Sequence, residues 1–538
     1  MRVLIIGIDG GTWRVLNPAM ERGHMPFLKG LVEGGVRGSL ASTTPPKTPA
    51  AWSAFQTGTN PGKTGIYDFA FWDRHERAVR YASAASLAGT LWELAGAAGR
   101  RVAVINVPLT YPPRAVNGYM ITGLPTPSLE SDFTWPPELR DELLKAVPDY
   151  HIFSLGGMSR RAPHRRPRQF IEMLNRIVEN RAVAACWLMA RGPLDLCMVH
   201  FQAPDVVQHV LWGYMDSTHP LYDPALHEYI LAEFYGRLDG QMRRVAQAFE
   251  ACGTGDCLTL VVSDHGFQTH LARVNLGNWL ARQGYLVVHP RRQRLGPLSG
   301  ILRTARKLGL EPLLRWTRFG RKLTMLLDEP AFEFDFSSSR VFSFSRGNDG
   351  FVFLLEQDAN ARAVTESQLR KDLAGLVDPR TRQQVVKSIH RKEEIYAGPK
   401  LDLLPDLIVK PADGYSFTGD YQHGVKRLFS PVRRWSDFHV GMHHADGILV
   451  ASGLGVRRGA QIAGARLVDI APTVLAVLGV AASPDMDGCA LGELFTAGFP
   501  AAQRPSKTVA PSANETHQYS QQDVENIERR LRELGYIE

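Results

Sequence analysis

Short runs of apolar residues, rich in Val, Ile and Leu, recur along the chain and end abruptly in Gly, Pro or Asp. We expect each run to form a strand that is buried on both faces, as in a parallel sheet covered by helices. The runs are residues 3–8, 102–107, 119–124, 194–200, 258–262, 407–409 and 448–450. Helix-like segments lie between them, at residues 25–33, 86–98, 170–190, 227–250 and 469–478. Because strands and helices alternate, the pattern predicts an α/β fold with a mainly parallel central sheet.

This alternation is interrupted between residues 275 and 400, which we interpret as an inserted cap subdomain. Its first part contains two basic, amphipathic candidate helices, and aromatic stretches with strand-like alternation follow. The candidate helices span residues 298–308 and 312–327, and the aromatic stretches span 332–344 and 350–355. The core then falls in two parts, residues 1–274 and 401–499. Residues 500–538 are predicted to be a polar linker followed by a terminal helix over 520–534, opened by Ser520 as N-cap.

Length and cysteine content narrow the class of protein. A chain of 538 residues can bury a large core without disulfide or metal staples. The cysteines number five and form no Cys-x-x-Cys pair, which argues against a disulfide scaffold and a thiolate zinc ribbon. The apolar run 3–8 is too short for a signal peptide, and no run is long enough to span a bilayer. We therefore expect a cytoplasmic protein.

Positive charge is concentrated in one stretch. The net charge is +8, yet residues 291–322 alone hold ten Lys and Arg against one acidic residue, Glu311. The basic character is therefore local. Two interpretations stay open: a solvated helix face, or a surface that attracts an anionic substrate or a membrane. The sequence contains no nucleic-acid recognition module.

Acidic and histidine side chains follow several of the predicted strands. Asp9 ends the first strand, and Asp264 and His265 follow the strand 258–262. Asp205 and His209 are four residues apart, so a helix beginning at Pro204 would place them on one side. Ligands in open α/β sheets gather at the carboxyl ends of strands. Singly, each residue has an ordinary alternative as a helix cap, turn residue or solvated side chain.

A fourth segment, Gly-Met-His-His-Ala-Asp, contains His443 and His444 and precedes the strand 448–450. The complete set offers only oxygen and nitrogen donors. Such a set suits two Zn²⁺ or Mn²⁺ ions better than Ca²⁺, which prefers shells made of oxygen alone. We prefer Zn²⁺ and keep Mn²⁺ as the alternative.

Five segments, in the same order, resemble the alkaline phosphatase superfamily, and specifically its type I phosphodiesterase/nucleotide pyrophosphatase branch. They are Gly-Ile-Asp-Gly at 7–10, Thr-x-Pro with Thr-Gly-x-x-Pro within 44–61, Pro-Asp-x-x-x-His at 204–209, Ser-Asp-His-Gly at 263–266 and Gly-x-His at 441–443. The resemblance covers roughly residues 1–270 and 395–495. It implies a three-layer α/β/α fold with a central mainly parallel sheet and an inserted cap.

The resemblance also implies the chemistry. Thr48 matches the nucleophile of a metal-dependent phosphoric ester hydrolase that acts on a small phosphorylated substrate through a phospho-threonine intermediate. Two divalent ions are implied. Asp9, Thr48, Asp264 and His265 match the ligands of one ion, and Asp205, His209 and His443 match those of the other. His444 is not expected to be a ligand.

One departure from the family affects substrate choice. Nucleotide pyrophosphatases carry an Asn three residues after the nucleophile, whereas this chain has Ala51. The alternatives that stay open are a phosphomonoesterase or phosphotransferase of the same superfamily, and a non-catalytic protein that binds anionic ligands or a membrane surface. The sulfatase motif Cys/Ser-x-Pro-x-Arg is absent. The oligomeric state is left open.

Overall fold

A nine-stranded sheet forms the centre of the larger lobe. The computed structural model describes residues 1–152, 162–290, 332–419, 421, 428–432, 439–496, 519–534 and 536. The strand order is β22 (Ala460–Ile462), β2 (Val36–Ala41), β21 (Asp446–Gly453), β9 (Cys257–Val262), β1 (Arg2–Ile8), β8 (Leu196–Phe201), β5 (Val102–Ile105), β6 (Gly118–Ile121) and β7 (Thr134–Trp135). The pairs from β9 through β6 are parallel, whereas β21 and β7 run antiparallel to their neighbours. The predicted mainly parallel sheet is confirmed.

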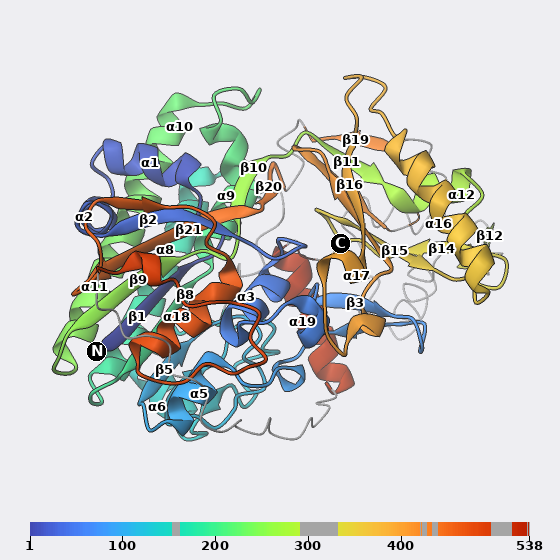
Figure 1. Ribbon diagram of the computed structural model, residues 1–538. Coiled ribbons are helices and arrows are strands. Elements are labelled where there is room, and N and C mark those ends of the chain that lie inside the picture. Colours follow the sequence, from blue (N-terminus) through green and yellow to red (C-terminus); the bar gives the residue numbers. More distant parts are fainter. Residues whose placement is uncertain are drawn as a thin grey trace, which may run out of the picture.

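Helices cover both faces of this sheet, because its central strands are apolar on both sides (Figure 1). In β1, Leu4, Ile6 and Ile8 belong to one buried cluster, and Val3 and Ile5 belong to the other. The first cluster packs on α1 (Trp13–Glu21), α2 (Pro26–Gly34), α6 (Leu139–Ala146), α8 (Pro167–Met189), α9 (Ala203–Met215) and α11 (Gly236–Ala251). The second packs on α3 (Thr48–Thr57), α5 (Leu91–Ala97) and α18 (Ile470–Val477). The fold is therefore the predicted three-layer α/β/α arrangement.

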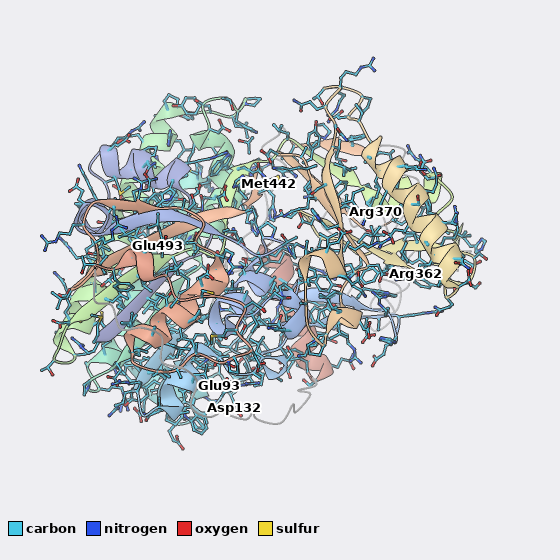
Figure 2. The ribbon with its side chains drawn as sticks, viewed as in Figure 1. Glu93, Asp132, Arg362, Arg370, Met442 and Glu493 are labelled. Atoms are coloured by element: carbon cyan, nitrogen blue, oxygen red, sulfur yellow. The ribbon has the colours of Figure 1, made fainter. Side chains whose placement is uncertain are left out.

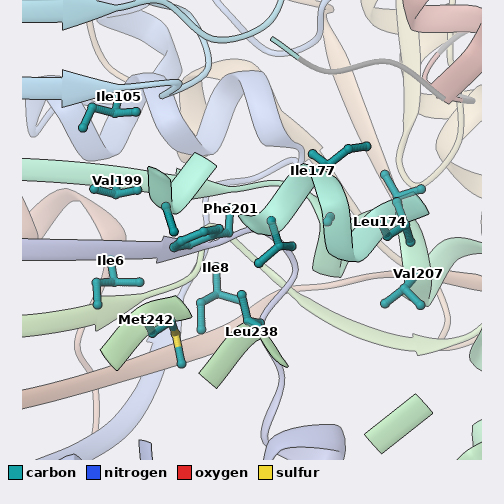
Figure 3. Packing of buried hydrophobic residues seen from close by; sticks show 14 of the residues in the cluster. Ile6, Ile8, Ile105, Leu174, Ile177, Val199, Phe201, Val207, Leu238 and Met242 are labelled. Atoms are coloured by element: carbon teal, nitrogen blue, oxygen red, sulfur yellow. The ribbon is translucent and has the colours of Figure 1, made fainter. Parts of the chain in front are cut away.

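Figure 3 shows the first cluster at close range. The labelled side chains of this cluster come from three strands, with Ile6, Val199 and Ile105, and from the helices α8 and α11, with Ile177 and Met242. All of these side chains are almost completely buried. The central strands are therefore held in a closely packed layer.

Several elements differ from the sequence-based expectations. The segment expected to be one helix over 227–250 consists of α10 (Pro224–Tyr229), a π-helical turn (Ile230–Tyr235) and α11. The pattern did not predict α1, α3, α6, β2 or β22. Two short helices, α4 (Pro61–Thr64) and α7 (Ala162–Arg165), also belong to this part of the chain.

A second lobe has its own core and lies beside the large sheet (Figure 1). Its main sheet has the order β14 (Val341–Ser343), β15 (Gly350–Leu354), β17 (Leu407–Pro411) and β16 (Val386–Arg391). A three-stranded sheet has the order β18 (Tyr415–Thr418), β11 (Ala272–Asn275) and β19 (Phe429–Pro431). One two-stranded sheet consists of β12 (Val288–Pro290) and β13 (Phe332–Phe334), and another consists of β3 (Ala70–Asp73) and β4 (Ala78–Tyr81). Its helices are α12 (Leu276–Arg282), α16 (Ala359–Ala374) and α17 (Lys392–Ile395).

The expectation that residues 407–409 belong to the large sheet was wrong. They lie in β17, which pairs antiparallel with β15 and β16 in the second lobe. A short apolar run indicates burial on both faces but does not indicate which sheet supplies its neighbours.

Polar contacts attach α16 to the sheet of the second lobe. Arg362 Nη2 lies 2.7 Å from Asp406 Oδ1, and Arg370 donates to the Ile389 carbonyl at 3.1 Å (Figure 2).

The terminal helix is present as α19 (Gln521–Leu534). As expected for its N-cap, Ser520 Oγ accepts the N–H of Asp523 at 3.1 Å. The basic stretch 291–322, with its candidate helices 298–308 and 312–327, lies outside the described residues. All five cysteines, each in a described segment, are free thiols. Within the described segments, no helix combines the length and apolar character that a membrane crossing requires.

Candidate metal centre

Three neighbouring parallel strands bring the predicted ligands to one edge of the large sheet. Asp9 follows β1, Asp264 and His265 follow β9, and α9 follows β8 with Asp205 in its first turn. Because β8, β1 and β9 are hydrogen-bonded neighbours, their carboxyl ends adjoin. His209 lies one turn after Asp205, as the four-residue spacing predicted.

His443 comes from β20 (Gly441–His444), which pairs antiparallel with β10 (Gly266–Thr269). Side chains alternate along a strand, so neighbouring histidines point to opposite sides. His443 is buried and joins the cluster. His444 is only partly buried, and its Nδ1 accepts the N–H of Asp446 at 3.1 Å. The structure thus brings His443, and not His444, to the other predicted ligands.

Asp205, His209 and His443 form a compact triangle of ligand atoms. Asp205 Oδ1 lies 3.3 Å from Nε2 of His209 and 3.2 Å from Nε2 of His443. The two Nε2 atoms are 2.8 Å apart. Tetrahedral ligands about 2.0–2.1 Å from a zinc ion would be separated by about 3.3 Å. The triangle therefore has nearly the size that one zinc ion requires.

The tautomer of each of the three candidate-ligand histidines follows from the hydrogen-bond partner of its Nδ1. In each, Nδ1 faces a backbone carbonyl, which can only accept, so Nδ1 carries the proton and Nε2 presents a lone pair. The pairs are His209 with Gly441 O at 3.0 Å, His443 with Pro46 O at 2.9 Å and His265 with Gly266 O at 3.1 Å. Burial lowers the pKa of His265 and of His443, which keeps both rings neutral. Ligating histidines in metalloproteins are held in this way.

A second group of ligand atoms surrounds His265. Its Nε2 lies 3.2 Å from Asp264 Oδ2, 3.6 Å from Asp9 Oδ1 and 4.0 Å from Asp205 Oδ1. Ligand atoms of Asp9, Asp205 and His265 all lie within 4.8 Å of one another. Asp205 therefore lies between the two groups, whereas the family pattern gave it to one ion only.

The carboxylates of the site are left without hydrogen-bond donors on one side. Among the described residues, no donor reaches Asp9 Oδ1, Asp205 Oδ1 or Asp264 Oδ2, and all three atoms are buried. Burial, together with the charges of neighbouring carboxylates, raises the pKa of Asp9 and of Asp264 well above the usual range. A bound cation would favour the ionised form of these carboxylates and would satisfy both their free oxygens and the nitrogen lone pairs that face them. The residues present therefore fit divalent metal ions.

Thr48 is the first residue of α3 and is completely buried. Its hydroxyl oxygen lies 3.4 Å from Nε2 of His265, so the hydroxyl is part of the second group. The N-terminus of a helix also favours negative charge at this position. Ala51, one turn further along, is buried and offers no side-chain donor.

Three further side chains contact the carboxylates and were not among the predicted site residues. Trp52 Nε1 donates to Asp9 Oδ2 at 3.2 Å, and His200 Nε2 lies 2.9 Å from the same oxygen. The position of His200 at the end of a predicted strand was a usable signal. Tyr536, near the C-terminus, donates its hydroxyl to Asp205 Oδ2 at 3.0 Å. No local pattern indicated that contact.

Comparison with solved structures identifies similar folds. Human ectonucleotide pyrophosphatase/phosphodiesterase 5 is 12% identical, with a TM-score of 0.51 over 92% of this chain and 100% of that one. Phosphonoacetate hydrolase from Sinorhizobium meliloti, solved with phosphonoformate, is 14% identical, with a TM-score of 0.52 over 89% of this chain and 96% of that one. No curated protein sequence matches the chain.

The model of the family named type I phosphodiesterase/nucleotide pyrophosphatase matches residues 3–446. The match spans most of the chain and includes every candidate ligand described above. The chain therefore belongs to the type I phosphodiesterase/nucleotide pyrophosphatase family of the alkaline phosphatase superfamily and is a hydrolase of phosphoric ester or anhydride bonds.

Proposed function

We propose that the protein is a metal-dependent phosphodiesterase or pyrophosphatase of a small phosphorylated substrate, with Thr48 as its nucleophile. One observation carries the proposal. The buried hydroxyl of Thr48 adjoins a cluster of carboxylate oxygens without donors and imidazole nitrogens whose lone pairs face inward. Such a cluster has no evident structural use in the absence of cations.

Two sets of residues would hold the ions. Asp205, His209 and His443 would hold one, and Asp9, Asp264 and His265 with Thr48 would hold the other. Asp205 is close enough to His265 to contribute to both sites. When bound, the ions supply Lewis-acid stabilisation of phosphoryl oxygens and lower the pKa of a coordinated hydroxyl. Mixed nitrogen and oxygen donors favour Zn²⁺, with Mn²⁺ as the alternative.

Thr48 performs the covalent step. Its Oγ1 attacks phosphorus, a bond forms between Oγ1 and phosphorus, and the bond to the leaving-group oxygen breaks. The proton lost by Thr48 ends on the departing oxygen. Water then attacks the phospho-threonine, restores the hydroxyl and releases the phosphoryl product. In sum, a diester and water give a monoester and an alcohol.

Ala51 bears on the substrate. A buried alanine at this position cannot donate a hydrogen bond to a phosphoryl oxygen, so that oxygen must be held by other groups of the site. This observation keeps phosphomonoester hydrolysis as the second candidate activity.

The test is a substrate panel with added Zn²⁺, Mn²⁺ or Mg²⁺. We expect an aryl phosphodiester or a nucleotide pyrophosphate to be cleaved faster than an aryl phosphomonoester; the reverse order would favour the second candidate. Thr48→Ala should keep its metal content and lose about a thousandfold or more in turnover. Thr57→Ala is the matched control, because that buried hydroxyl lies at the other end of α3 and donates to the Ser53 carbonyl.

Retention of activity within about tenfold in Thr48→Ala would refute the nucleophile. The metal proposal has its own readout in elemental analysis. The purified protein should hold close to two divalent ions per chain, and His443→Ala should hold about one fewer. Full activity after exhaustive chelation would refute metal dependence.

A further inference from the structure

The C-terminal segment is seated on the larger lobe by both apolar and polar contacts. Ile527, Leu531 and Leu534, spaced along one side of α19, are buried in the same cluster as the strand β1. Arg530 Nη1 donates to the Thr126 carbonyl at 2.7 Å. Before the helix begins, Tyr519 donates its hydroxyl to the Ala82 carbonyl at 3.1 Å. The helix is therefore fixed in position on the core (Figure 1).

From this helix the chain carries Tyr536 into the candidate metal centre. The N–H of Tyr536 donates to the Leu531 carbonyl at 2.8 Å, and its ring meets Phe69 edge-on with centroids 5.1 Å apart. Its hydroxyl accepts from Gln202 Nε2 at 3.1 Å and donates to Asp205 Oδ2 at 3.0 Å. The same hydroxyl also has a hydrogen bond with the side chain of Thr48. Because the hydroxyl accepts from Gln202, its single proton is directed to the Asp205 carboxylate.

Asp205 is the carboxylate that both ligand groups share. Its Oδ1 faces Nε2 of His443 at 3.2 Å and Nε2 of His265 at 4.0 Å. A carboxylate can rotate about its terminal bond, and rotation would turn Oδ1 away from these nitrogens. The described structure gives Oδ2 a single hydrogen-bond donor, Tyr536.

On the basis of the proposed function, we propose that Tyr536 is a positioning residue, which holds the Asp205 carboxylate so that Oδ1 faces both metal positions. In this role the hydroxyl acts through Asp205. The metal centre is then completed by a residue from the end of the chain, more than 300 positions after the carboxylate that it orients. Residues that orient metal ligands typically contribute about 10–100-fold to metal affinity.

The experiment compares Tyr536→Phe with Tyr519→Phe and the parent chain. Each change removes one hydroxyl from the C-terminal segment and keeps the aromatic ring. The Tyr536 hydroxyl donates to a candidate ligand, whereas the Tyr519 hydroxyl donates to a backbone carbonyl. Titration calorimetry of the chelator-treated proteins with Zn²⁺ should show about 10–100-fold weaker binding of at least one ion to Tyr536→Phe. Tyr519→Phe should match the parent. A chain that ends at Leu534 should behave like Tyr536→Phe.

Kinetics give a second readout. The activity of Tyr536→Phe should be low at limiting Zn²⁺ and should recover at saturating Zn²⁺, whereas a general loosening of α19 would lower it at all concentrations. Parent-like Zn²⁺ affinity in Tyr536→Phe, or equal weakening in Tyr519→Phe, would overturn the proposal. If zinc affinity falls as expected but the parent hydrolyses no phosphoric ester, the proposed function fails and the positioning role stands.

Discussion

We expect the Asp264 carboxylate to destabilise the metal-free protein and to stabilise the metal-bound protein. Asp9 Oδ1 lies 3.6 Å and Asp264 Oδ2 3.2 Å from the same nitrogen of His265, so the two oxygens are at most about 7 Å apart. Two unit charges at that distance repel by about 2 kcal/mol at an effective dielectric constant of about 20. Replacing Asp264 by Asn removes this repulsion.

The local structure accommodates Asn at this position. Asp264 Oδ1 accepts the N–H of Gly10 at 3.1 Å, and an amide oxygen can keep that bond. The amide nitrogen would replace Oδ2 and could donate to the lone pair of His265 Nε2. Asp264→Asn should therefore add no unsatisfied group to the metal-free protein.

The stability that Asp264→Asn adds to the metal-free protein should grow as the pH rises. Burial first, and then the charge of Asp205, raise the pKa of Asp264 in the folded protein. A raised folded pKa means that its stabilising contribution is present at low pH and is lost as the pH rises through that pKa. Asn does not titrate, so the free energy of unfolding of Asp264→Asn should exceed that of the metal-free parent at alkaline pH, by about 2 kcal/mol from the charge repulsion with Asp9 alone.

Urea unfolding from pH 6 to pH 9, with chelator or with excess Zn²⁺, measures both effects. Zinc at 100 times its dissociation constant should stabilise the parent by about 2.7 kcal/mol, and the variant by less, because it has lost a ligand. Asp256→Asn is the matched control, since Asp256 is exposed at the opposite end of β9. The reasoning would be refuted if Asp264→Asn were less stable than the parent in chelator at every pH. It would also be refuted if Zn²⁺ raised the free energy of unfolding of the variant as much as that of the parent.

Three further changes test other parts of the structure. Burial raises the pKa of Asp349 to about 6, so the parent should lose about 3 kcal/mol of stability between pH 4 and pH 6 that Asp349→Asn keeps; identical pH profiles in urea unfolding would contradict this. Trp52→Phe removes the donor to Asp9 Oδ2 and should weaken Zn²⁺ binding about 10–100-fold in calorimetry, whereas unchanged affinity would exclude an orienting role. Gly10→Ala should lower the melting temperature, because φ is +68° and the added Cβ would lie 2.5 Å from the Phe267 ring; an unchanged melting temperature would show that the loop adapts.

Much of the site could be predicted because it follows the geometry of a parallel sheet. Runs of apolar residues identified β1, β8 and β9, and polar residues directly after them had to meet at one edge. Helical spacing then joined His209 to Asp205. The choice of His443 over His444 needed the family resemblance, since the antiparallel pairing of β20 with β10 that selects it has no local sequence signal.

The rest depended on contacts between distant parts of the chain. The segment 407–409 reads as a buried strand, but only the tertiary fold places it in the second lobe. Trp52 reads as an apolar core residue, and its single polar atom becomes informative only when it faces Asp9. Tyr536 is separated from Asp205 by more than 300 residues, so no periodicity or spacing connects them.

The ligands of this site are oriented by two kinds of support, and the difference predicts where the site is sensitive. The three histidines donate to backbone carbonyls, and Asp264 accepts a backbone N–H, so their orientation depends on the main chain at the sheet edge. Asp9 and Asp205 accept hydrogen bonds instead from the side chains of Trp52 and Tyr536. Side-chain substitutions cannot remove a backbone partner but can remove these two. Sensitivity to mutation outside the ligands themselves should therefore concentrate around the two side-chain-oriented carboxylates, one of which depends on the C-terminus of the chain.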